Sequence, residues 1–152
     1  MNNLQFYYVN QDYINYLRKF DKKIALKNRP YIGINLNQEF LFLAPLYSPK
    51  EKHKKYYMNN TFFRIYDFED QYIGIIKFSN MIPVLKKFVT KINFNCSNKL
   101  YQEQYYILKH QKQVIKKAMY TYCNYSEHKD LCVNFKKMEN IIKNTAHFSA
   151  VK

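Results

Sequence analysis

The pattern of apolar residues changes period once along the 152-residue chain, and this change limits the possible folds more than any other feature. Between Leu4 and Val84, short apolar runs alternate with polar turns, as in β-strands. From Leu100 onward, apolar residues recur every three or four positions, as in α-helices. Strands followed by helices favour an α+β fold, so we expect helices packed on a small, curved antiparallel sheet or barrel.

The strand segments are expected to form two hairpins. Asn37-Gln38, two residues that suit a tight turn, closes the first, and the acidic turn Asp67–Asp70 closes the second. One helix, Gln11–Phe20 with Asn10 as its N-cap, interrupts the strands, and a polar, mobile loop follows it at Lys22–Asn28. The expected strands are Leu4–Val9, Tyr31–Leu36, Glu39–Leu46, Thr61–Tyr66, Gln71–Phe78 and Met81–Val84.

The second half of the chain predicts one long helix and a shorter final helix marked by Phe135 and Ile142. We find no linker, low-complexity tract or repeat, so residues 1–152 are expected to form a single domain. The expected inner face of the long helix comprises Leu100, Gln104, Ile107, Leu108, Gln111, Ile115, Ala118, Met119 and Tyr122.

The charge balance points to a polyanionic partner. The chain has 25 Lys and Arg residues but only 11 Asp and Glu residues, for a net charge of +14. An AT-rich genome explains why lysine outnumbers arginine, but not why acidic residues are so few. Such an excess attracts polyanions and favours a nucleic acid. A membrane is disfavoured, because no apolar run approaches ~18 residues and no long basic amphipathic helix is evident.

Several kinds of chemistry are excluded or disfavoured. Two glycines are too few for a glycine-rich phosphate loop. The three cysteines lack metal-ligand spacing, so we interpret them as free thiols of a cytoplasmic protein, and the N-terminus lacks the features of a signal peptide. The only acidic cluster lies in the Asp67–Asp70 turn, which does not suit a metal-dependent nuclease. No hydrolase triad and no pair of histidines is evident, and we expect no metal and no cofactor.

One expected strand must end at Ser48-Pro49-Lys50. Proline lacks the amide hydrogen that a sheet needs, so Ser48 and Lys50 should stand at the rim of the sheet. These residues are typical of a plain strand-ending turn. They also suit a phosphate site, because a basic and aromatic segment follows. Cations bind phosphates, and each aromatic ring that stacks on an unpaired base stabilises the complex by about 1–3 kcal/mol. The cationic and imidazole members of that segment are Lys52, His53, Lys54 and Lys55.

Arg29 is one of only three arginines, and it directly precedes the expected strand Tyr31–Leu36. A guanidinium fork at this place suits a phosphate, although an ordinary surface arginine fits the sequence equally well. In a hairpin, the start of the first strand and the end of the second lie side by side. Arg29 should therefore be a neighbour of Ser48 and Lys50.

Gln111 interrupts the apolar face of the expected long helix. A buried amide without a hydrogen-bond partner costs about 1–3 kcal/mol. Gln111 is therefore either a core amide bonded to the backbone or an amide that opens into a cleft and contacts RNA.

Sequence motifs along nearly the whole chain resemble those of one family. They are F-Y-Y-V and D-Y-I-N-Y-L-R-K-F-D near the N-terminus, R-P-Y-I-G-I at 29–34, A-P-L-Y-S-P-K-E-K-H at 44–53 and I-x-F-S-N-M-I-P-V ending at Val84. Y-Y-I-L-K-H-Q-K-Q-V-I-K-K-A and L-C-V-N-F-K-K-M-E follow in the helical half. In this combination the chain resembles the ToxN/AbiQ family, endoribonuclease toxins of type III toxin–antitoxin systems.

The resemblance implies a compact, interferase-like barrel with added helices, and RNA cleavage without a metal ion, commonly at A-rich sites. It implies that Ser48 and Lys50 are the catalytic serine and lysine, with Arg29 as a further basic residue of the site. The chain departs from the family at Tyr47, where a small hydroxyl residue often stands; there we expect stacking or hydrogen-bond donation. It also implies roles for Tyr13 and Gln111, which we expect to contact RNA, and we expect a further RNA contact at Tyr31.

The resemblance also implies an antitoxin that is a small RNA pseudoknot. The enzyme would trim the antitoxin precursor, remain bound to the product in a closed protein–RNA hetero-oligomer, and cut target mRNA when free. The nucleophile would be the RNA's own 2′-hydroxyl, which yields a 2′,3′-cyclic phosphate and a 5′-hydroxyl.

A cationic lysine is a poor base at neutral pH, so Lys50 is expected to act as an acid or an electrostatic partner, and the general base is unassigned. Two alternatives stay open. One is a non-catalytic RNA-binding module in which S-P-K is only a turn. The other is a barrel-type mRNA interferase with a protein antitoxin.

Overall fold

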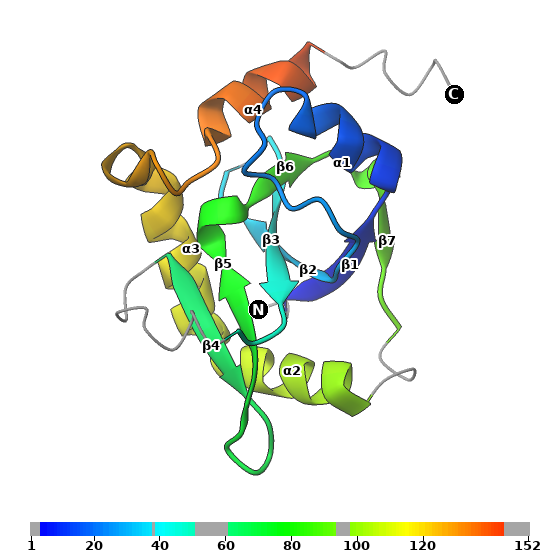
Figure 1. The fold of residues 1–152 in the computed structure, drawn as a ribbon, viewed down its shortest axis with the longest axis vertical. Coiled ribbons are helices and arrows are strands. Elements are labelled where there is room, and N and C mark those ends of the chain that lie inside the picture. Colours follow the sequence, from blue (N-terminus) through cyan, green and yellow to red (C-terminus); the bar gives the residue numbers. More distant parts are fainter. Residues whose placement is uncertain (1–3, 38, 51–60, 94–97, 145–152) are drawn as a thin grey trace.

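The structure is a computed structural model that describes residues 4–37, 39–50, 61–93 and 98–144. A twisted sheet lies at its centre, with α1 (Gln11–Arg18) and α4 (Phe135–Lys143) at one end and α2 (Asn98–Lys109) at the other (Figure 1). The fourth helix, α3 (Gln111–Cys123), runs along one side. Apolar side chains from all four helices and from β1 to β6 meet in one contiguous core.

The sheet has seven antiparallel strands in the order β4-β5-β3-β2-β1-β7, with β6 also paired to β3. The edge strands β4 and β7 do not pair, so the described strands form an open sheet. The predicted α+β fold with an antiparallel sheet is confirmed, whereas a closed barrel is wrong for these strands. The strands are β1 (Gln5–Val9), β2 (Tyr31–Asn35), β3 (Leu41–Tyr47), β4 (Phe62–Tyr66), β5 (Tyr72–Lys77), β6 (Ile82–Val84) and β7 (Val89–Lys91).

Strand β3 is the hub of this sheet. Along one edge it pairs with β2, from Asn35 opposite Leu41 to Tyr31 opposite Pro45. Along the other edge it pairs first with β6 and then, at Leu46 and Tyr47, with β5. Its core residues are almost fully buried, as expected for a strand covered on both faces. Because β3 joins both halves of the sheet, its C-terminal end is held in a fixed position.

Two loops differ from the sequence predictions. The β2–β3 turn spans residues 36–40 rather than two, because the Asn37 side chain accepts hydrogen bonds from the amides of Glu39 and Phe40, both at 2.9 Å. The segment after α1 is not a loosely attached loop: Ile24 is buried, and Arg18 Nη1 donates to the carbonyl oxygens of Lys22 (3.1 Å) and Ile24. The hydrogen bonds of Arg18 and the burial of Ile24 therefore anchor a segment that is mostly polar in sequence.

The predicted long helix is wrong in one respect, because it is broken at His110. This residue leaves helical geometry (φ −112°, ψ 23°), and α3 starts anew at the next position. No glycine or proline marks the break in the sequence. The buried face also differs from the expected one: Glu103 in α2 and Lys117 in α3 are buried, whereas Met119 is exposed. Lys117 is accommodated because its ammonium donates to the carbonyl oxygen of Phe62 in β4 at 3.2 Å.

Glu103 is a buried carboxyl that packs against the backbone of β5. It is only 5% exposed, and a Cβ atom at Gly74 would overlap its Oε2 atom, so the glycine makes room for it. Burial raises the pKa of Glu103 from 4.5 to about 7, although nearby Lys99 acts in the opposite direction. The folded chain therefore holds a proton here that the unfolded chain releases between pH 4.5 and 7, and the free energy of unfolding falls as the pH rises through this range.

We predict that Glu103→Gln removes this pH dependence, because glutamine keeps the shape of the neutral acid. The wild type should lose roughly 1–3 kcal/mol of unfolding free energy relative to the variant between pH 5 and pH 8. Urea denaturation at several pH values measures this difference. Glu69→Gln, at an exposed turn position, is the matched control and should follow the wild type. Parallel curves for the wild type and Glu103→Gln would contradict the assignment.

Candidate active site

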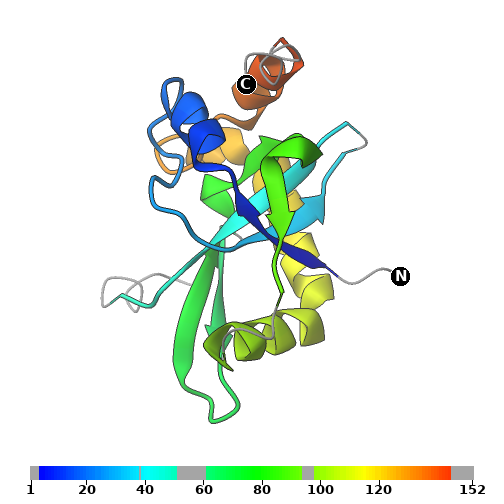
Figure 2. The same cartoon turned by 90° about the vertical axis from the view of Figure 1, so that its right-hand side faces the viewer.

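The start of β2 and the end of β3 are joined directly. The Leu46 amide donates to the Pro30 carbonyl oxygen at 2.9 Å, and Arg29 Nη1 donates to the Leu46 carbonyl oxygen at 3.3 Å. The segment that follows α1 lies on the same side of the molecule as this end of β3, and α3 lies on the opposite side (Figure 2). The hairpin thus brings residue 29 to residues 46–48, as its strand register requires.

The guanidinium of Arg29 is held in place. Its Nε donates to the Lys27 carbonyl oxygen at 3.3 Å, and its central carbon lies 4.0 Å from the centre of the Tyr47 ring. A planar guanidinium stacked on an aromatic ring keeps its remaining donors in a fixed fork, which suits an oxyanion. This arginine is therefore pre-oriented rather than free on the surface.

A cavity of about 510 Å³ opens beside Arg29 and contains both Ser48 and Lys50 in its lining. We call it the β2–β3 cavity. Four of its lining residues are cationic at neutral pH and none is acidic, so the cavity favours an anion. Ser48 and Lys50 are exposed at its rim. The lining residues are Arg18, Ile24, Ala25, Leu26, Lys27, Arg29, Tyr47, Ser48 and Lys50.

Tyr47 is the aromatic surface of this cavity. It is half-buried, and the ammonium of Lys77 in β5 lies 4.7 Å from its ring centre, in addition to the Arg29 guanidinium. Burial raises the pKa of Tyr47, while Arg29 and Arg18 act in the opposite direction. The phenol therefore stays protonated at neutral pH and can donate a hydrogen bond.

Tyr31 lies in the same neighbourhood but is buried, with 1% of its surface exposed. Its hydroxyl has no hydrogen-bond partner among the described residues. Burial raises the pKa of Tyr31, neighbouring Tyr47 raises it further, and Arg29 acts against both. A buried hydroxyl without a partner is costly, so this donor is available to a ligand or to water.

Three described residues that were predicted to contact RNA do not line the β2–β3 cavity: Tyr31, Tyr13 and Gln111. Tyr13 is 2% exposed, stacks on Phe88 at 4.5 Å and donates its hydroxyl to the Pro83 carbonyl oxygen at 3.0 Å, so it is a core residue. Gln111 begins α3, and its Oε1 accepts from the Leu4 amide at 3.2 Å. Gln111 is half-buried, and this contact is the backbone hydrogen bond expected if its amide belongs to the core. Lys52, His53, Lys54 and Lys55 lie outside the described residues.

Three cationic residues near the site were not predicted to belong to it from the sequence. Arg18, in the last turn of α1, and Lys27 line the cavity because the segment after α1 folds back over the end of β3. Lys77 reaches Tyr47 because it lies diagonally across from it in the register of β3 and β5. Ile75 is paired with Tyr47, and strand alternation places Lys77 on the same face of β5 as Ile75. The role of Lys77 could not be predicted, because the pairing of β5 with β3 was not predicted.

The described part of the chain holds no group of three His, Cys, Asp or Glu side chains that could bind a metal ion together. Nor does it contain a helix with the length and apolarity needed to cross a membrane.

Comparison with known proteins gives consistent matches. The family model "Toxin ToxN, type III toxin-antitoxin system" matches residues 5–143. Endoribonuclease ToxN of Pectobacterium atrosepticum is 30% identical over 115 residues, which is 68% of this chain and 67% of that protein. Endoribonuclease ToxN of Bacillus thuringiensis subsp. kurstaki is 30% identical over 92 residues, covering 56% of this chain and 45% of that protein.

Two solved structures share the fold. One is the structure of a bacterial type III toxin that is selectively inhibited by a non-coding RNA pseudoknot. It superimposes with a TM-score of 0.82 and 21% sequence identity, and the match covers 95% of this chain and 98% of that chain. The other is AbiQ, a lactococcal anti-phage endoribonuclease of a type III toxin–antitoxin system. It superimposes with a TM-score of 0.82 and 19% sequence identity, and the match covers 99% of this chain and 100% of that chain. The family model covers most of the chain, and the chain therefore belongs to the ToxN family of type III toxin–antitoxin toxins.

Proposed function

We propose that this protein is an endoribonuclease toxin that cleaves RNA without a metal ion and is inhibited by a small RNA pseudoknot. The observation that carries the proposal is the convergence of Arg29, Ser48 and Lys50 on one cationic cavity without a carboxylate in its lining. Its ToxN relatives are endoribonucleases. The family match argues against an mRNA interferase with a protein antitoxin, since the matching model describes type III systems.

The reaction is an in-line attack of the RNA's 2′-hydroxyl oxygen on the adjacent phosphorus. The bond between O2′ and phosphorus forms as the bond between phosphorus and O5′ breaks, which leaves a 2′,3′-cyclic phosphate. The proton of the 2′-hydroxyl passes to water at the open rim of the cavity, and the departing O5′ takes a proton from Lys50. No nucleophile from the protein is needed, so positioning and charge stabilisation supply the catalysis.

Four residues in and beside the cavity then have distinct roles. Arg29, fixed on Tyr47, holds the non-bridging oxygens of the scissile phosphate as their negative charge grows. Ser48 donates a hydrogen bond to one of these oxygens. Tyr31, which is buried next to Tyr47 and Arg29 and does not line the cavity, supplies a further hydroxyl donor, because burial keeps it protonated. Tyr47 offers its ring or hydroxyl to the neighbouring nucleotide.

The antitoxin RNA occupies the same cationic surface. A relative of this fold is inhibited by a non-coding RNA pseudoknot, which supports an RNA rather than a protein inhibitor. Trimming of the antitoxin precursor, a preference for A-rich sites and a closed protein–RNA assembly belong to the same proposal. The free thiols of Cys123 and Cys132 fit a reducing cytoplasm, where the mRNA targets are found.

Ser48→Ala and Lys50→Ala should each abolish cleavage of RNA in the presence of EDTA while largely sparing the binding of antitoxin RNA. The physical reason is that each variant removes a group that acts on the scissile phosphate but leaves the rest of the cationic surface intact. Gel analysis of the RNA and growth assays at equal expression measure the effect. Lys86→Ala, an exposed lysine outside the cavity, is the matched control and should cut normally. Normal cleavage by both site variants would refute the assignment, and failure of the wild type to cut RNA in EDTA would favour a binding module.

The Tyr47 ring can be tested separately from its hydroxyl. Tyr47→Phe keeps the platform under Arg29 and Lys77, whereas Tyr47→Leu removes it. Because two cation–π contacts are worth about 0.5–2 kcal/mol each, we expect Tyr47→Leu to lower kcat/KM roughly 10-fold or more. Tyr47→Phe should stay within a few-fold of the wild type. Equal losses in the two variants would show that the hydroxyl, and not the ring, matters.

Lys27→Ala should reduce the number of ions released when RNA binds. Only the carbonyl of Lys27 is used to hold Arg29, so the variant keeps that contact. The slope of log Kd against log salt concentration should fall by about 0.7, as expected for one lost phosphate contact to a single strand. Lys91→Ala, on the edge strand β7, should leave the slope unchanged. An unchanged slope in Lys27→Ala would place the RNA elsewhere.

A further inference from the structure

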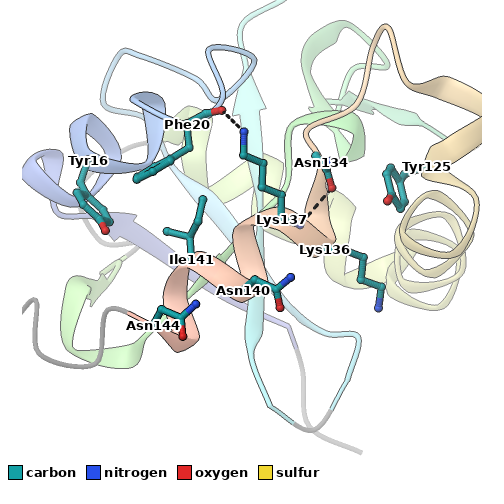
Figure 3. Close-up of a pocket in the computed structure, with 9 residues that line it drawn as sticks. All are labelled: Tyr16, Phe20, Tyr125, Asn134, Lys136, Lys137, Asn140, Ile141 and Asn144. Carbon is teal, nitrogen blue, oxygen red and sulfur yellow. Dashed lines mark hydrogen bonds between the residues drawn. The ribbon is translucent and has the colours of Figure 1, made fainter.

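We infer that the groove between α1 and α4 is a second RNA site, which holds one unpaired base together with its backbone phosphate. The inference rests on the proposed function and adds a contact remote from the scissile bond. The groove has a volume of about 620 Å³. Figure 3 shows Tyr16 of α1 and Phe20, just past its end, on one side, and Asn140 and Ile141 of α4 with its C-cap Asn144 on the other.

The aromatic wall suits a stacked base. The first helix was expected to extend to Phe20, but α1 ends at Arg18 and Phe20 is 39% exposed. Tyr16 packs edge-on against it, with ring centres 5.4 Å apart. The edge contact holds the Phe20 ring and leaves part of its surface to solvent. An exposed aromatic surface of this kind stacks on any base with a gain of about 1–3 kcal/mol.

The opposite wall carries amides with unused hydrogen-bonding capacity. Asn140 lies in α4 and Asn144 is the C-cap of this helix; the two are four residues apart, so their side chains are on the same side. Their side-chain amides form no hydrogen bond with the described residues, although their backbones are bonded within the helix. An amide pairs a donor with an acceptor, which is the pattern on the edge of a base, most closely that of adenine.

A lysine bridges the two walls. Lys137 Nζ donates to the Phe20 carbonyl oxygen at 3.1 Å, as Figure 3 shows, and Lys136 lies at one end of the groove. An ammonium has three donors, so Lys137 can hold the Phe20 carbonyl and a phosphate together. No carboxylate is present among the lining residues. Lys136 is paired with Glu139 at 3.9 Å and donates to the Tyr122 hydroxyl, so Lys137 is the cation that favours an anion next to the aromatic surface.

These features favour RNA over a protein segment. Ile141 is the one aliphatic side chain in the lining, which is too little apolar surface to hold an amphipathic helix. The chain also carries a net charge of +14, which favours a polyanion. Tyr16 and Phe20 flank Arg18, whose side chain lines the β2–β3 cavity. The last turn of α1 thus stands between the two sites, and one bound RNA can reach both.

The test measures the affinity of the full-length protein for a fluorescein-labelled, 2′-O-methylated oligoadenylate, which cannot be cleaved. Fluorescence anisotropy gives Kd for the wild type, Phe20→Leu, Phe20→Tyr and the double variant Asn140→Ala/Asn144→Ala. Phe68→Leu is the matched control, because Phe68 is also an exposed phenylalanine, 57% accessible, but lies in the acidic β4–β5 turn. Thermal unfolding of each variant checks its fold; the Asn residues are exposed, so the double variant should fold normally.

Phe20→Leu should raise Kd roughly 10-fold, because the stacking surface is lost. The double Asn variant should raise Kd several-fold, and Phe20→Tyr and Phe68→Leu should bind like the wild type. Unchanged binding by both Phe20→Leu and the double variant would overturn the inference. So would an equal loss in Phe68→Leu, since it would mean that any exposed ring contributes.

Two further measurements distinguish a failure of the groove inference from a failure of the proposed function. If AMP alone binds the groove as tightly as the oligonucleotide, the site takes a free nucleotide and the RNA assignment is wrong. Cleavage of an unmodified dinucleotide, too short to span both sites, should proceed at the same rate in Phe20→Leu and the wild type. If the wild type cuts RNA in EDTA but Phe20→Leu binds normally, only the groove inference fails. If the wild type does not cut, the proposed function fails.

Discussion

The candidate site depends on two features of β3: strands pair with it on both edges, and a proline terminates it. Its two edges are paired, with β2 on one side and with β6 and β5 on the other, so the strand cannot shift without breaking both halves of the sheet. Pro49 then prevents further pairing, because it has no amide hydrogen. The Leu46 amide is bonded to Pro30, and its carbonyl oxygen to Arg29. A rigid backbone therefore delivers Ser48 and Lys50 to the side of the Arg29 guanidinium.

Electrostatics turn this rigid edge into a site for an anion. The β2–β3 cavity gathers four cationic side chains without a carboxylate to neutralise them. Such a concentration of like charge is unfavourable in the absence of a ligand, and the Tyr47 ring offsets part of the cost for Arg29 and Lys77. The structure thus keeps its guanidinium ordered before RNA arrives, which is the condition for stabilising a transition state by pre-organised charge.

The sequence predicted the parts of this arrangement that depend on local rules. Hairpin geometry was enough to bring Arg29 next to Ser48, and alternation and turn residues located six of the seven strands. The short strand β7 and the helix break at His110 were missed, because no turn residue or proline marks them. Arg18 and Lys77 could not be assigned either, since they reach the site only through the fold of the segment after α1 and the pairing of β5 with β3. The family motif predicted that Tyr13 contacts RNA. Its observed contacts place it in the core, where its hydroxyl donates to the Pro83 carbonyl oxygen.

The most direct test of the account is a crystal structure of the protein with an RNA whose scissile 2′-hydroxyl is replaced by hydrogen. The account predicts that the phosphate at the blocked position lies in the β2–β3 cavity. Its non-bridging oxygens should be within hydrogen-bonding distance of the Arg29 guanidinium and Ser48 Oγ, and its O5′ should face Lys50 Nζ. A scissile phosphate bound on another surface, with this cavity filled by the protein's own side chains, would contradict it.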